Sequence, residues 1–591
     1  MKKNQIRKSL AALAMAAVVS VSLLGYGCSS PASSGSSTGV SGEFTGSAKG
    51  MGGDVTVTLT LTDGVITGCT AEGKDETPGI GTMALEQLPT AIAESGSIAV
   101  DGVSTATITS DAIKEAAAAA LTAAGLNPED YKTEVKVEQT KAEDSTLDAD
   151  IVVVGAGGAG MTAAITAASE GKSVVIVESQ PMVGGNSVRA TGGMNAAKTV
   201  YQDENEFGES AGVEKTLAAA AEKYADNETI TALAKTVSEQ WAAYQANPTG
   251  YFDSVELMEL DTMIGGKGVN DPALVETLCE NSADAIDWLD EHGITLHSVS
   301  SFGGASVKRI HRPVNAEGKT VSVGSYMIPL LEENCQKAGV QILLNTTATK
   351  ILTDANGAAV GIEATGSTGE TVTVNAKSVV LASGGFGANL DMVVQYKPEL
   401  KGFMTTNAAG IQGQGIEMAT AIGAETVDMD QIQIHPTVEA NTAALITEGL
   451  RGDGAVLINA EGKRFIDEVG TRDVVSAAEI AQTGSYSWLV VDQAMADASS
   501  VIQGYIKKGY TVTGQTYEEL AKAMGVDEAA FAETMKTWNG YVAAKNDPDF
   551  GRTSFAKALD TAPYYAIKVT AGVHHTMGGL KINTNTEVLK A

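Results

Sequence analysis

Hydrophobic and polar positions change character several times along the first 130 residues. The first eight residues include four basic side chains, and an apolar run from Leu10 to Leu24 follows them. This pattern predicts an export signal, because the run is shorter than a comfortable transmembrane helix. Residues 54–61 alternate between polar and apolar side chains, which predicts a half-buried strand closed by a turn at 62–64. Helical patterns follow over 84–94 and 110–124.

A different pattern begins near residue 149. Residues 149–154 end in a continuous β-branched run, which is typical of a strand buried in a parallel sheet. A glycine-rich loop, a helix through Ala168 and a second apolar strand over 173–177 come next, and a similar strand recurs at 378–381. The alternation of strands with helices predicts an α/β fold preceded by a small α+β domain.

Composition limits the classes of protein that this chain can be. The chain has 591 residues, of which 43% are hydrophobic, so it is globular with two or three domains. Its formal net charge of −32 excludes a nucleic-acid partner, and a small anion could bind only where basic residues gather. None of the four cysteines forms a C-x-x-C pair, and only six histidines are scattered along the chain. We therefore expect no haem, no metal site and no iron–sulfur cluster.

The glycine-rich loop after the strand at 149–154 has the spacing of a dinucleotide-binding fingerprint. Gly155, Gly157 and Gly160 open the helix, and Glu178 ends the next strand. Glycines permit the tight turn and the approach of a pyrophosphate, and the helix N-terminus provides N–H donors. Glu178 would accept hydrogen bonds from the adenosine ribose. FAD and NAD both use this fingerprint, so the loop alone leaves the choice open.

Basic and polar residues then gather between positions 430 and 580, where an acidic chain could hold an anion. His435, Thr447, Glu448, Arg451, Arg472 and His574 lie in this part of the sequence. Each of these residues could also have an ordinary structural role. Glu448 and Arg451 could form a helix ion pair, and His574 could be a core histidine. From chemistry alone, Arg472 would clamp a carboxylate, because a guanidinium normally stays protonated.

Several further segments resemble the flavoprotein family of fumarate reductases and succinate dehydrogenases. Residues 184–187 (GGNS), 190–195 (ATGGMN) and 382–387 (ASGGFG) are similar to that family's flavin loops. The resemblance implies non-covalent FAD in a glutathione-reductase-like (Rossmann-type) α/β domain with an inserted α+β cap that closes over the flavin. The FAD-binding residues would be Gly155, Gly157, Gly160, Glu178, Gly185, Asn186, Gly192, Gly193 and Gly384.

Residues 148–591 are similar to soluble fumarate reductases of the flavocytochrome type, and this likeness assigns roles to the polar cluster. It implies hydride transfer from FAD N5 to the C=C bond of a small unsaturated carboxylate, with Arg472 as the proton donor. Glu448 and Arg451 would return the proton to Arg472. His435, Thr447 and His574 would bind the substrate carboxylate.

Residues 101–110 (DGVSTATITS) resemble the flavinylation motif of FMN-binding domains, although the family often has Gly where this chain has Thr105. The resemblance implies that a flavin transferase links FMN covalently to Thr107. The local alternative is a Ser/Thr-rich helix entry in which Ser110 is the N-cap.

The N-terminus resembles a bacterial lipoprotein processing site, with a small residue before Cys28. We expect a lipid on Cys28, a Ser/Gly-rich tether over 29–41, and a location at the extracytoplasmic face of the cell membrane. Electrons would run from a membrane quinol or another reductase to FMN and then to FAD. The predicted organisation is signal peptide 1–27, tether 28–41, FMN domain 42–138, FAD domain 148–429, cap 430–568 and a return to the FAD domain over 569–591.

The identity of the substrate is left open by the sequence. Phe302 and Leu445 stand near positions where fumarate enzymes tend to have Met. Urocanate reductases share the two-flavin layout but tend to have Tyr at the position of His435, so this histidine favours a dicarboxylate. The family also continues past the position of Ala591 with a second clamping Arg and a helix that points at FAD. The remaining alternatives are a flavin-carrying electron-transfer lipoprotein with an incomplete FAD site and a same-fold dehydrogenase or oxidase.

Overall fold

A computed structural model describes residues 39–591 apart from 75, 77–80, 104–105, 133–140, 302–304, 317, 319, 553 and 556. The predicted export signal and Cys28 lie outside the described residues. No helix within the described ranges is long and apolar enough to cross a membrane.

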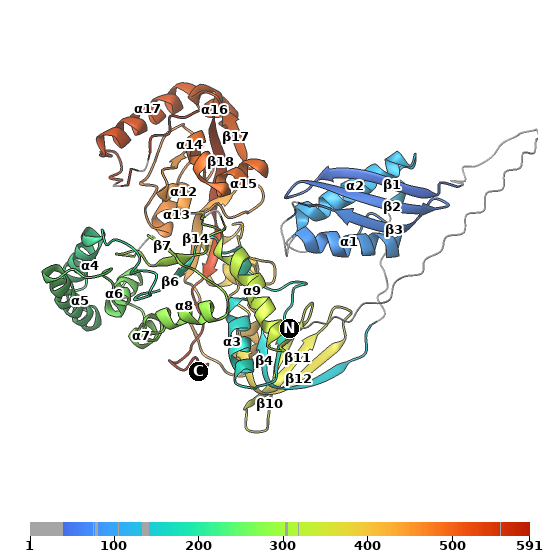
Figure 1. Ribbon diagram of the computed structural model, residues 1–591, viewed down its shortest axis with the longest axis horizontal. Coiled ribbons are helices and arrows are strands. Elements are labelled where there is room, and N and C mark those ends of the chain that lie inside the picture. Colours follow the sequence, from blue (N-terminus) through green and yellow to red (C-terminus); the bar gives the residue numbers. More distant parts are fainter. Residues whose placement is uncertain are drawn as a thin grey trace, which may run out of the picture.

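The first unit, residues 39–132, is an antiparallel three-stranded sheet with two helices packed on it (Figure 1). Its middle strand carries the predicted alternation, and Val55, Val57, Leu59 and Leu61 point into the core. Asp63 and Gly64 both have positive φ, as a tight two-residue hairpin requires. The elements of this unit are β1 (Gly42–Lys49), β2 (Asp54–Thr62), β3 (Val65–Glu72), α1 (Gly81–Ser95), α2 (Thr107–Ala123) and a 3-10 turn (Pro128–Tyr131).

Helix α2 begins four residues earlier than it would with Ser110 as its N-cap, so that interpretation is wrong. The helix starts at Thr107, and Ala106 occupies the N-cap position without a side-chain hydrogen bond. Ser110 is fully buried, and its hydroxyl accepts a hydrogen bond from the Val103 N–H at 3.0 Å. The loop before the helix thus folds back onto the first helical turn and ties Ser110 there.

The second unit is built on a six-stranded sheet with the strand order β10-β11-β12-β4-β5-β9. β12, β4, β5 and β9 run parallel, whereas β10 and β11 return antiparallel as a hairpin. α3 and α9 pack together beside β4 and β5, which places the N-terminus of α3 at the carboxyl edge of the parallel strands (Figure 1). The elements are β4 (Ser145–Val154), α3 (Gly158–Ser169), β5 (Val174–Val177), α9 (Val323–Lys337), β9 (Gln341–Leu343), β10 (Thr347–Thr353), β11 (Ala359–Thr365) and β12 (Thr371–Leu381).

A layer of helices is inserted between β5 and α9. It has its own core, in which Phe207, Trp241, Tyr244 and Phe252 contact one another edge-on or stacked. A small sheet of order β6-β8-β7 joins this layer to the rest of the unit. The elements are β6 (Met194–Asn195), α4 (Ser210–Lys223), α5 (Glu228–Ala246), α6 (Val255–Gly265), α7 (Pro272–Glu280), α8 (Ser282–Glu291), β7 (Ser298–Ser300) and β8 (Ile310–Arg312), with a 3-10 turn at Ser187–Arg189.

The last part of the chain forms a sheet of order β14-β18-β16-β15, with β17 also paired to β18. Its helices pack over a core that includes Trp538, Phe531 and Leu489. The long strand β18 runs through residue 568, the predicted end of the cap. The elements are β14 (Ile432–Glu439), α12 (Gly449–Gly452), β15 (Val456–Ile458), α13 (Arg472–Ile480), β16 (Tyr486–Asp492), α14 (Gln493–Ala498), α15 (Ser500–Lys507), β17 (Thr511–Gly514), α16 (Tyr517–Met524), α17 (Glu528–Ala544) and β18 (Tyr564–Thr576).

Shorter elements link the two sheets, and the predicted mixed α/β character is confirmed. β13 pairs with β19 where the chain returns from the second sheet. The linking elements are α10 (Leu390–Tyr396), a 3-10 turn (Pro398–Leu400), α11 (Gln414–Thr420), β13 (Thr426–Val427) and β19 (Gly579–Leu580).

Candidate functional site

Two glycines of the fingerprint loop are required by the packing of the chain itself. Gly155 has φ +104°, and a Cβ there would lie 2.5 Å from the Ala382 carbonyl oxygen at the end of β12. A Cβ on Gly160 would lie 1.9 Å from the Gly155 carbonyl oxygen. α3 can therefore approach the strand ends only because these positions have no side chain.

Gly157 has no such internal reason to be glycine. A Cβ there would meet no atom closer than the Ser187 hydroxyl at 3.6 Å, and its φ is −78°. Gly157 is also the N-cap of α3 and supplies no side-chain hydrogen bond to the first turn. The Gly158 N–H already donates to the Ser187 hydroxyl at 3.1 Å, so the open space beside Gly157 at the N-terminus of α3 is what fits an anionic phosphate.

Glu178 lies beside this loop. One carboxylate oxygen accepts the Ala156 N–H at 2.8 Å, and the other accepts the Gln180 N–H at 2.9 Å. The side chain thus ties the fingerprint loop to the end of β5. Its expected contact with a ribose stays a prediction.

The other predicted flavin loops converge on the same edge. Gly185 and Gly384 both have positive φ and both face Ile411. Asn186 donates to Asn407 at 2.6 Å and accepts the Ala408 N–H at 2.8 Å.

Gly192 and Gly193 precede β6. Gly193 lies against the carbonyl of His311, where a Cβ would come within 2.3 Å. These loops, together with Gly155, Gly157 and Gly160, are the residues that would hold FAD.

A continuous row of charged side chains joins the N-terminus of α13 to α12. Arg472, the first residue of α13, donates through Nε to Glu448 at 2.8 Å and through Nη1 to the Gln433 side-chain oxygen at 2.7 Å. The other Glu448 oxygen accepts from Arg451 Nη2 at 3.0 Å. The predicted order Arg472, Glu448, Arg451 is thus a hydrogen-bonded row, in which the Arg472 side chain is 22% exposed and that of Arg451 only 1%.

Arg451 also contacts two segments that come later in the chain. Its Nη1 donates to the Glu468 carbonyl at 2.6 Å, and its own carbonyl accepts from Arg552 at 2.7 Å. Burial lowers the pKa of Arg451, and the positive charge of Arg472 acts in the same direction, whereas Glu448 opposes it. A guanidinium in this setting gives up a proton more readily than one in water.

His435 and His574 lie on the paired strands β14 and β18, with ring centroids 5.1 Å apart. His435 Nδ1 accepts the Thr437 N–H at 3.2 Å, so a neutral His435 carries its proton on Nε2. Burial lowers the pKa of His435 well below its ordinary value, and it lowers that of His574 to about 3. Arg472 contributes to both shifts, so both rings are neutral at pH 7 and can act as hydrogen-bond donors.

Thr447 lies half-buried next to Glu448, with its N–H donating to the Tyr505 hydroxyl at 3.0 Å. Leu445 is also half-buried, and its carbonyl accepts from Tyr505 at 3.4 Å. Phe302, the other predicted wall position, lies outside the described residues.

Four residues of the site escaped the sequence analysis as functional residues. Gln433 orients Arg472, and Thr406 contacts His574 Nδ1 at 2.7 Å. Asn407 donates to the His574 carbonyl and bridges to Asn186, while Tyr505 supports Thr447. Gln433 lies two residues before His435, and residues two apart in a strand share a face of the sheet. This spacing could have identified Gln433 from the sequence. The others come from distant segments and have no local signal.

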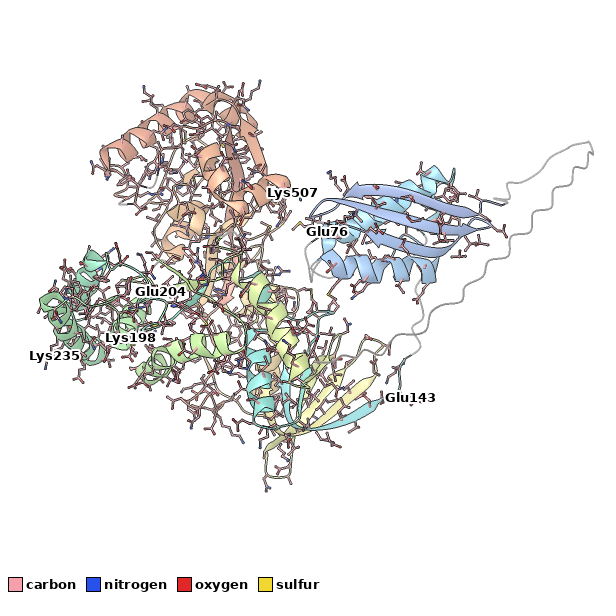
Figure 2. The ribbon with its side chains drawn as sticks, in the orientation of Figure 1. Glu76, Glu143, Lys198, Glu204, Lys235 and Lys507 are labelled. Carbon is pink, nitrogen blue, oxygen red and sulfur yellow. The ribbon has the colours of Figure 1, made fainter. Side chains whose placement is uncertain are left out.

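In the first unit, Thr107 is the first residue of α2, and its side chain lies outside the described part. Glu76, labelled in Figure 2, is buried near this helix end. It accepts the Gly52 N–H at 2.9 Å and the Thr109 hydroxyl at 2.5 Å. A buried carboxylate thus connects the β1–β2 turn to the first turn of α2.

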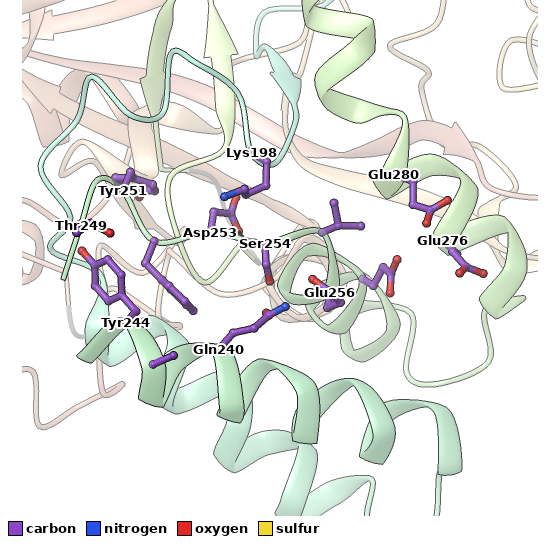
Figure 3. A pocket seen from close by; sticks show the side chains of 14 residues that line it. Lys198, Gln240, Tyr244, Thr249, Tyr251, Asp253, Ser254, Glu256, Glu276 and Glu280 are labelled. Carbon is purple, nitrogen blue, oxygen red and sulfur yellow. Dashed lines mark hydrogen bonds between the residues drawn. The ribbon is translucent and has the colours of Figure 1, made fainter. Parts of the chain in front are cut away.

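A separate pocket of about 830 Å³ opens among the helices α5, α6 and α7 (Figure 3). Glu256, Glu259, Glu276 and Glu280 line it, and burial together with the other three glutamates raises the pKa of Glu259 to about 7. This acidic lining disfavours a carboxylate ligand. Across the described residues, no group of three or more His, Cys, Asp or Glu side chains is placed to hold a metal ion.

Comparison with known proteins identifies two domain families in this chain. The FAD binding domain family matches residues 150–252 and 240–591, and the FMN-binding domain family matches residues 50–122. The chain is 38% identical over 509 residues to the NADH:fumarate oxidoreductase of Klebsiella pneumoniae, which covers 86% of this chain and 49% of that protein. It therefore spans about half the length of that relative.

Two other relatives are matched over more of their length. The fumarate reductase (cytochrome) of Shewanella frigidimarina is 38% identical over 460 residues, covering 78% of this chain and 72% of that protein. The urocanate reductase of Eggerthella lenta is 33% identical over 582 residues, covering 95% and 88%.

Solved structures agree with the sequence relatives. The open conformation of a flavocytochrome c3 fumarate reductase is similar with a TM-score of 0.59 at 36% identity, covering 75% of this chain and 70% of that one. A 3-ketosteroid dehydrogenase from Rhodococcus jostii shares the fold alone, at 23% identity and a TM-score of 0.52. With both flavin-domain families matched, the chain belongs to the family of FAD-dependent oxidoreductases that contains the fumarate and urocanate reductases.

Proposed function

We propose that this chain is an exported flavoprotein that reduces the C=C bond of a small unsaturated carboxylate, either a fumarate-like acid or urocanate. The observation that carries the proposal is the hydrogen-bonded row Arg472, Glu448, Arg451, which begins beside two neutral histidines. The row combines a proton source with carboxylate-binding groups in a strongly acidic protein.

Arg472 is the proposed proton donor. An isolated guanidinium is a poor acid, because its pKa lies above about 12. Here, the Glu448 carboxylate contacts both Arg472 and Arg451, so a proton that leaves Arg472 can be replaced through Glu448. Gln433 holds the guanidinium in one orientation, which keeps the donating N–H aimed at one place.

His435, His574 and Thr447 are the proposed substrate-binding residues. The neutral His435 offers its Nε2–H, because Nδ1 already accepts from the backbone. A neutral donor binds a carboxylate oxygen without competing with Arg472 for the proton. His435 favours a second carboxylate on the substrate, whereas the match to a urocanate reductase extends over the whole two-flavin layout.

FAD would lie on the glycine loops described above, and when bound it supplies the hydride. FMN would be attached to Thr107 by a flavin transferase and would pass electrons onward to FAD. A membrane quinol or another reductase is the proposed electron donor, and a lipid on Cys28 would keep the protein at the extracytoplasmic face of the membrane. The match of an FMN-binding domain to residues 50–122 supports the two-flavin arrangement.

The test is anaerobic oxidation of reduced viologen by the purified protein, co-expressed with a flavin transferase, against fumarate, urocanate and methacrylate. We expect turnover with one of the three acids. Glu448→Gln keeps the size of the side chain but not its charge, so we expect it to lower kcat by at least about 10²-fold with KM little changed. Lys235→Ala, an exposed position seen in Figure 2, is the control and should behave as the native protein.

Silence with all three acids, despite bound FAD and FMN, would show that the proposed reaction is wrong. Equal rates for Glu448→Gln and the native protein would show that Arg472 does not draw its proton through Glu448.

A further inference from the structure

We propose that Glu479 extends the proton path behind Arg451, so that protons travel from the end of α13 through Glu479, Arg451 and Glu448 to Arg472. This inference rests on the proposed function, because it deepens the role of the same row.

The first support is the placement of polar residues on α13. Arg472, Ser476 and Glu479 are spaced four and three residues apart, so they share one side of the helix. Ser476 and Glu479 have no exposed surface at all. Helix faces that turn toward a core are normally apolar, because a buried polar group without a hydrogen-bond partner costs free energy.

The second support is a set of buried polar atoms whose hydrogen-bonding capacity is not used. Arg451 Nε, one Glu479 oxygen and the Ser476 hydroxyl have no hydrogen-bond partner among the described residues. The other Glu479 oxygen accepts from the Ser487 hydroxyl on β16. An unused N–H donor on Arg451 and an unused carboxyl oxygen on Glu479 are chemically complementary, and a bridging water molecule is the proposed link between them.

The third support is electrostatic. Burial raises the pKa of the Glu479 carboxyl to about 8, with Ser487 and Arg451 opposing the shift. Such a group holds a proton near neutral pH and can also give it up. α13 also packs against β14 and β18. The causes that lower the pKa values of their histidines, His435, His574 and His575, include burial and Arg472 but not Glu479. Arg451 is thus the charged group within the described residues that acts on Glu479.

The end of α13 that carries Glu479 reaches the surface, because the helix ends at Ile480 and residues 483–485 are exposed. The Glu479 carboxyl itself is buried, and this end of the helix is the proposed point of proton entry. In each turnover one proton leaves Arg472 for the substrate carbon, which leaves Arg472 neutral. Arg451 passes a proton to the Glu448 carboxylate, and Glu448 passes it on to Arg472 and becomes a carboxylate again. Glu479 then reprotonates Arg451, and water reprotonates Glu479. No residue in the path is oxidised or reduced, since the hydride and its electron pair come from the reduced flavin.

The experiment compares Glu479→Gln and Glu479→Asp with the native holoenzyme, and uses the exposed Glu461→Gln as the matched control. We expect Glu479→Gln to lower kcat by about tenfold to a hundredfold, with KM unchanged within about twofold and an increased solvent deuterium isotope effect. Glu479→Asp keeps a carboxyl group, so it should recover part of the rate. Equal losses in the Gln and Asp variants would assign a packing role to Glu479 and overturn the proposal, as would an unchanged kcat in Glu479→Gln.

A second readout does not depend on turnover. A protonated buried carboxyl group gives an infrared band that is absent from Glu479→Gln, and in the native protein this band should disappear as the pH rises through about 8. If the native protein reduces no acid, the proposed function fails, and the infrared band still tests Glu479. A band that is missing or that persists at pH 10 would overturn the proton path.

Discussion

Gly157 and Gly160 stand three residues apart at the start of one helix and meet different needs. Gly160 has no room for a side chain, since a Cβ would lie 1.9 Å from the Gly155 carbonyl oxygen. Gly157 has room, and its nearest contact would be 3.6 Å away. One glycine therefore serves the fold and the other is available to a ligand.

This difference predicts opposite behaviour for two alanine variants. Gly160→Ala should destabilise the apoprotein by roughly 1–3 kcal/mol through overpacking. Gly157→Ala should leave the unfolding midpoint unchanged and weaken FAD binding by about tenfold, because the methyl group stands where the pyrophosphate approaches. Urea unfolding of the apoprotein and fluorescence titration with FAD measure the two effects. A stable Gly157→Ala variant with native FAD affinity would show that Gly157 is not part of the cofactor site.

His574 makes stability depend on pH. Its pKa is about 3 in the folded protein and about 6.5 when unfolded, so the unfolded chain binds more protons below pH 6.5. The stabilisation is complete above pH 6.5 and is lost as pH falls from 6.5 toward 3. Between pH 7 and pH 5 the loss should be roughly 2 kcal/mol.

The measurement is the free energy of unfolding at pH 7 and pH 5, followed by tryptophan fluorescence, for the native protein and His574→Gln. All four tryptophans lie beyond residue 240, so the signal reports the part of the chain that contains His574. The glutamine variant should lose less stability on acidification. An identical pH dependence would show that His574 is not a buried neutral histidine.

At the scale of elements, the part of the chain after β15 contains a buried group of charges that holds one end of the row Arg472, Glu448, Arg451. Glu468 has no exposed surface and accepts from Arg464 at 2.7 Å and from Arg552 at 2.9 Å. Arg464 also pairs with Asp547 at 2.9 Å, and both arginines lie over the Trp538 ring. Arg552 in turn binds the Arg451 carbonyl, so this group fixes the far end of the row.

Glu468→Gln leaves two buried guanidinium groups with one remaining carboxylate. We expect a destabilisation of about 3–5 kcal/mol, because breaking a buried ion pair exposes an uncompensated charge to a low-dielectric interior. Urea unfolding measures it, with the exposed Glu461→Gln as the control. A loss below about 1 kcal/mol would mean that water reaches these charges.

At the scale of the whole molecule, the acidic character of the chain contrasts with the basic residues at the candidate site. The chain carries a net charge of −32, and four glutamates line the pocket of the helical layer, whereas Arg472 and Arg451 lie together at the candidate site. If the proposed substrate is correct, a small carboxylate is repelled by most of the protein and attracted to these two arginines, which favours selectivity for small anions.

One substitution should remove the flavin from one of the two predicted flavin units and leave the other flavin bound. Thr107→Ala removes the hydroxyl that a phosphoester needs, so the protein should lose covalent FMN and keep FAD. A denaturing gel viewed for flavin fluorescence reports the first, and the absorbance of released flavin reports the second. Viologen-driven turnover should persist if viologen reduces FAD directly, with Thr109→Ala as the control for attachment. Covalent flavin that survives in Thr107→Ala would place the attachment elsewhere.

The sequence by itself determined the mixed α/β class of the fold, whereas the roles assigned to the site residues stay predictions. β-branched runs, the glycine spacing and the helical patterns are local, so β4, α3 and β5 were predictable close to their observed bounds. Glu448 and Arg451, three residues apart, were predictable as neighbours for the same reason. The family resemblance added the order of roles, which no local spacing contains.

The tertiary structure decided what depends on contacts between distant segments. Arg472 meets Gln433 and Glu448 only because α13 packs against β14, and His574 meets His435 only because β18 pairs with β14. Ser110 is tied to the preceding loop, which moved the start of α2 away from the expected N-cap. Glu479 became notable only through its burial beside Arg451, because burial and electrostatic coupling are properties of the packed chain and are not visible in its residue types.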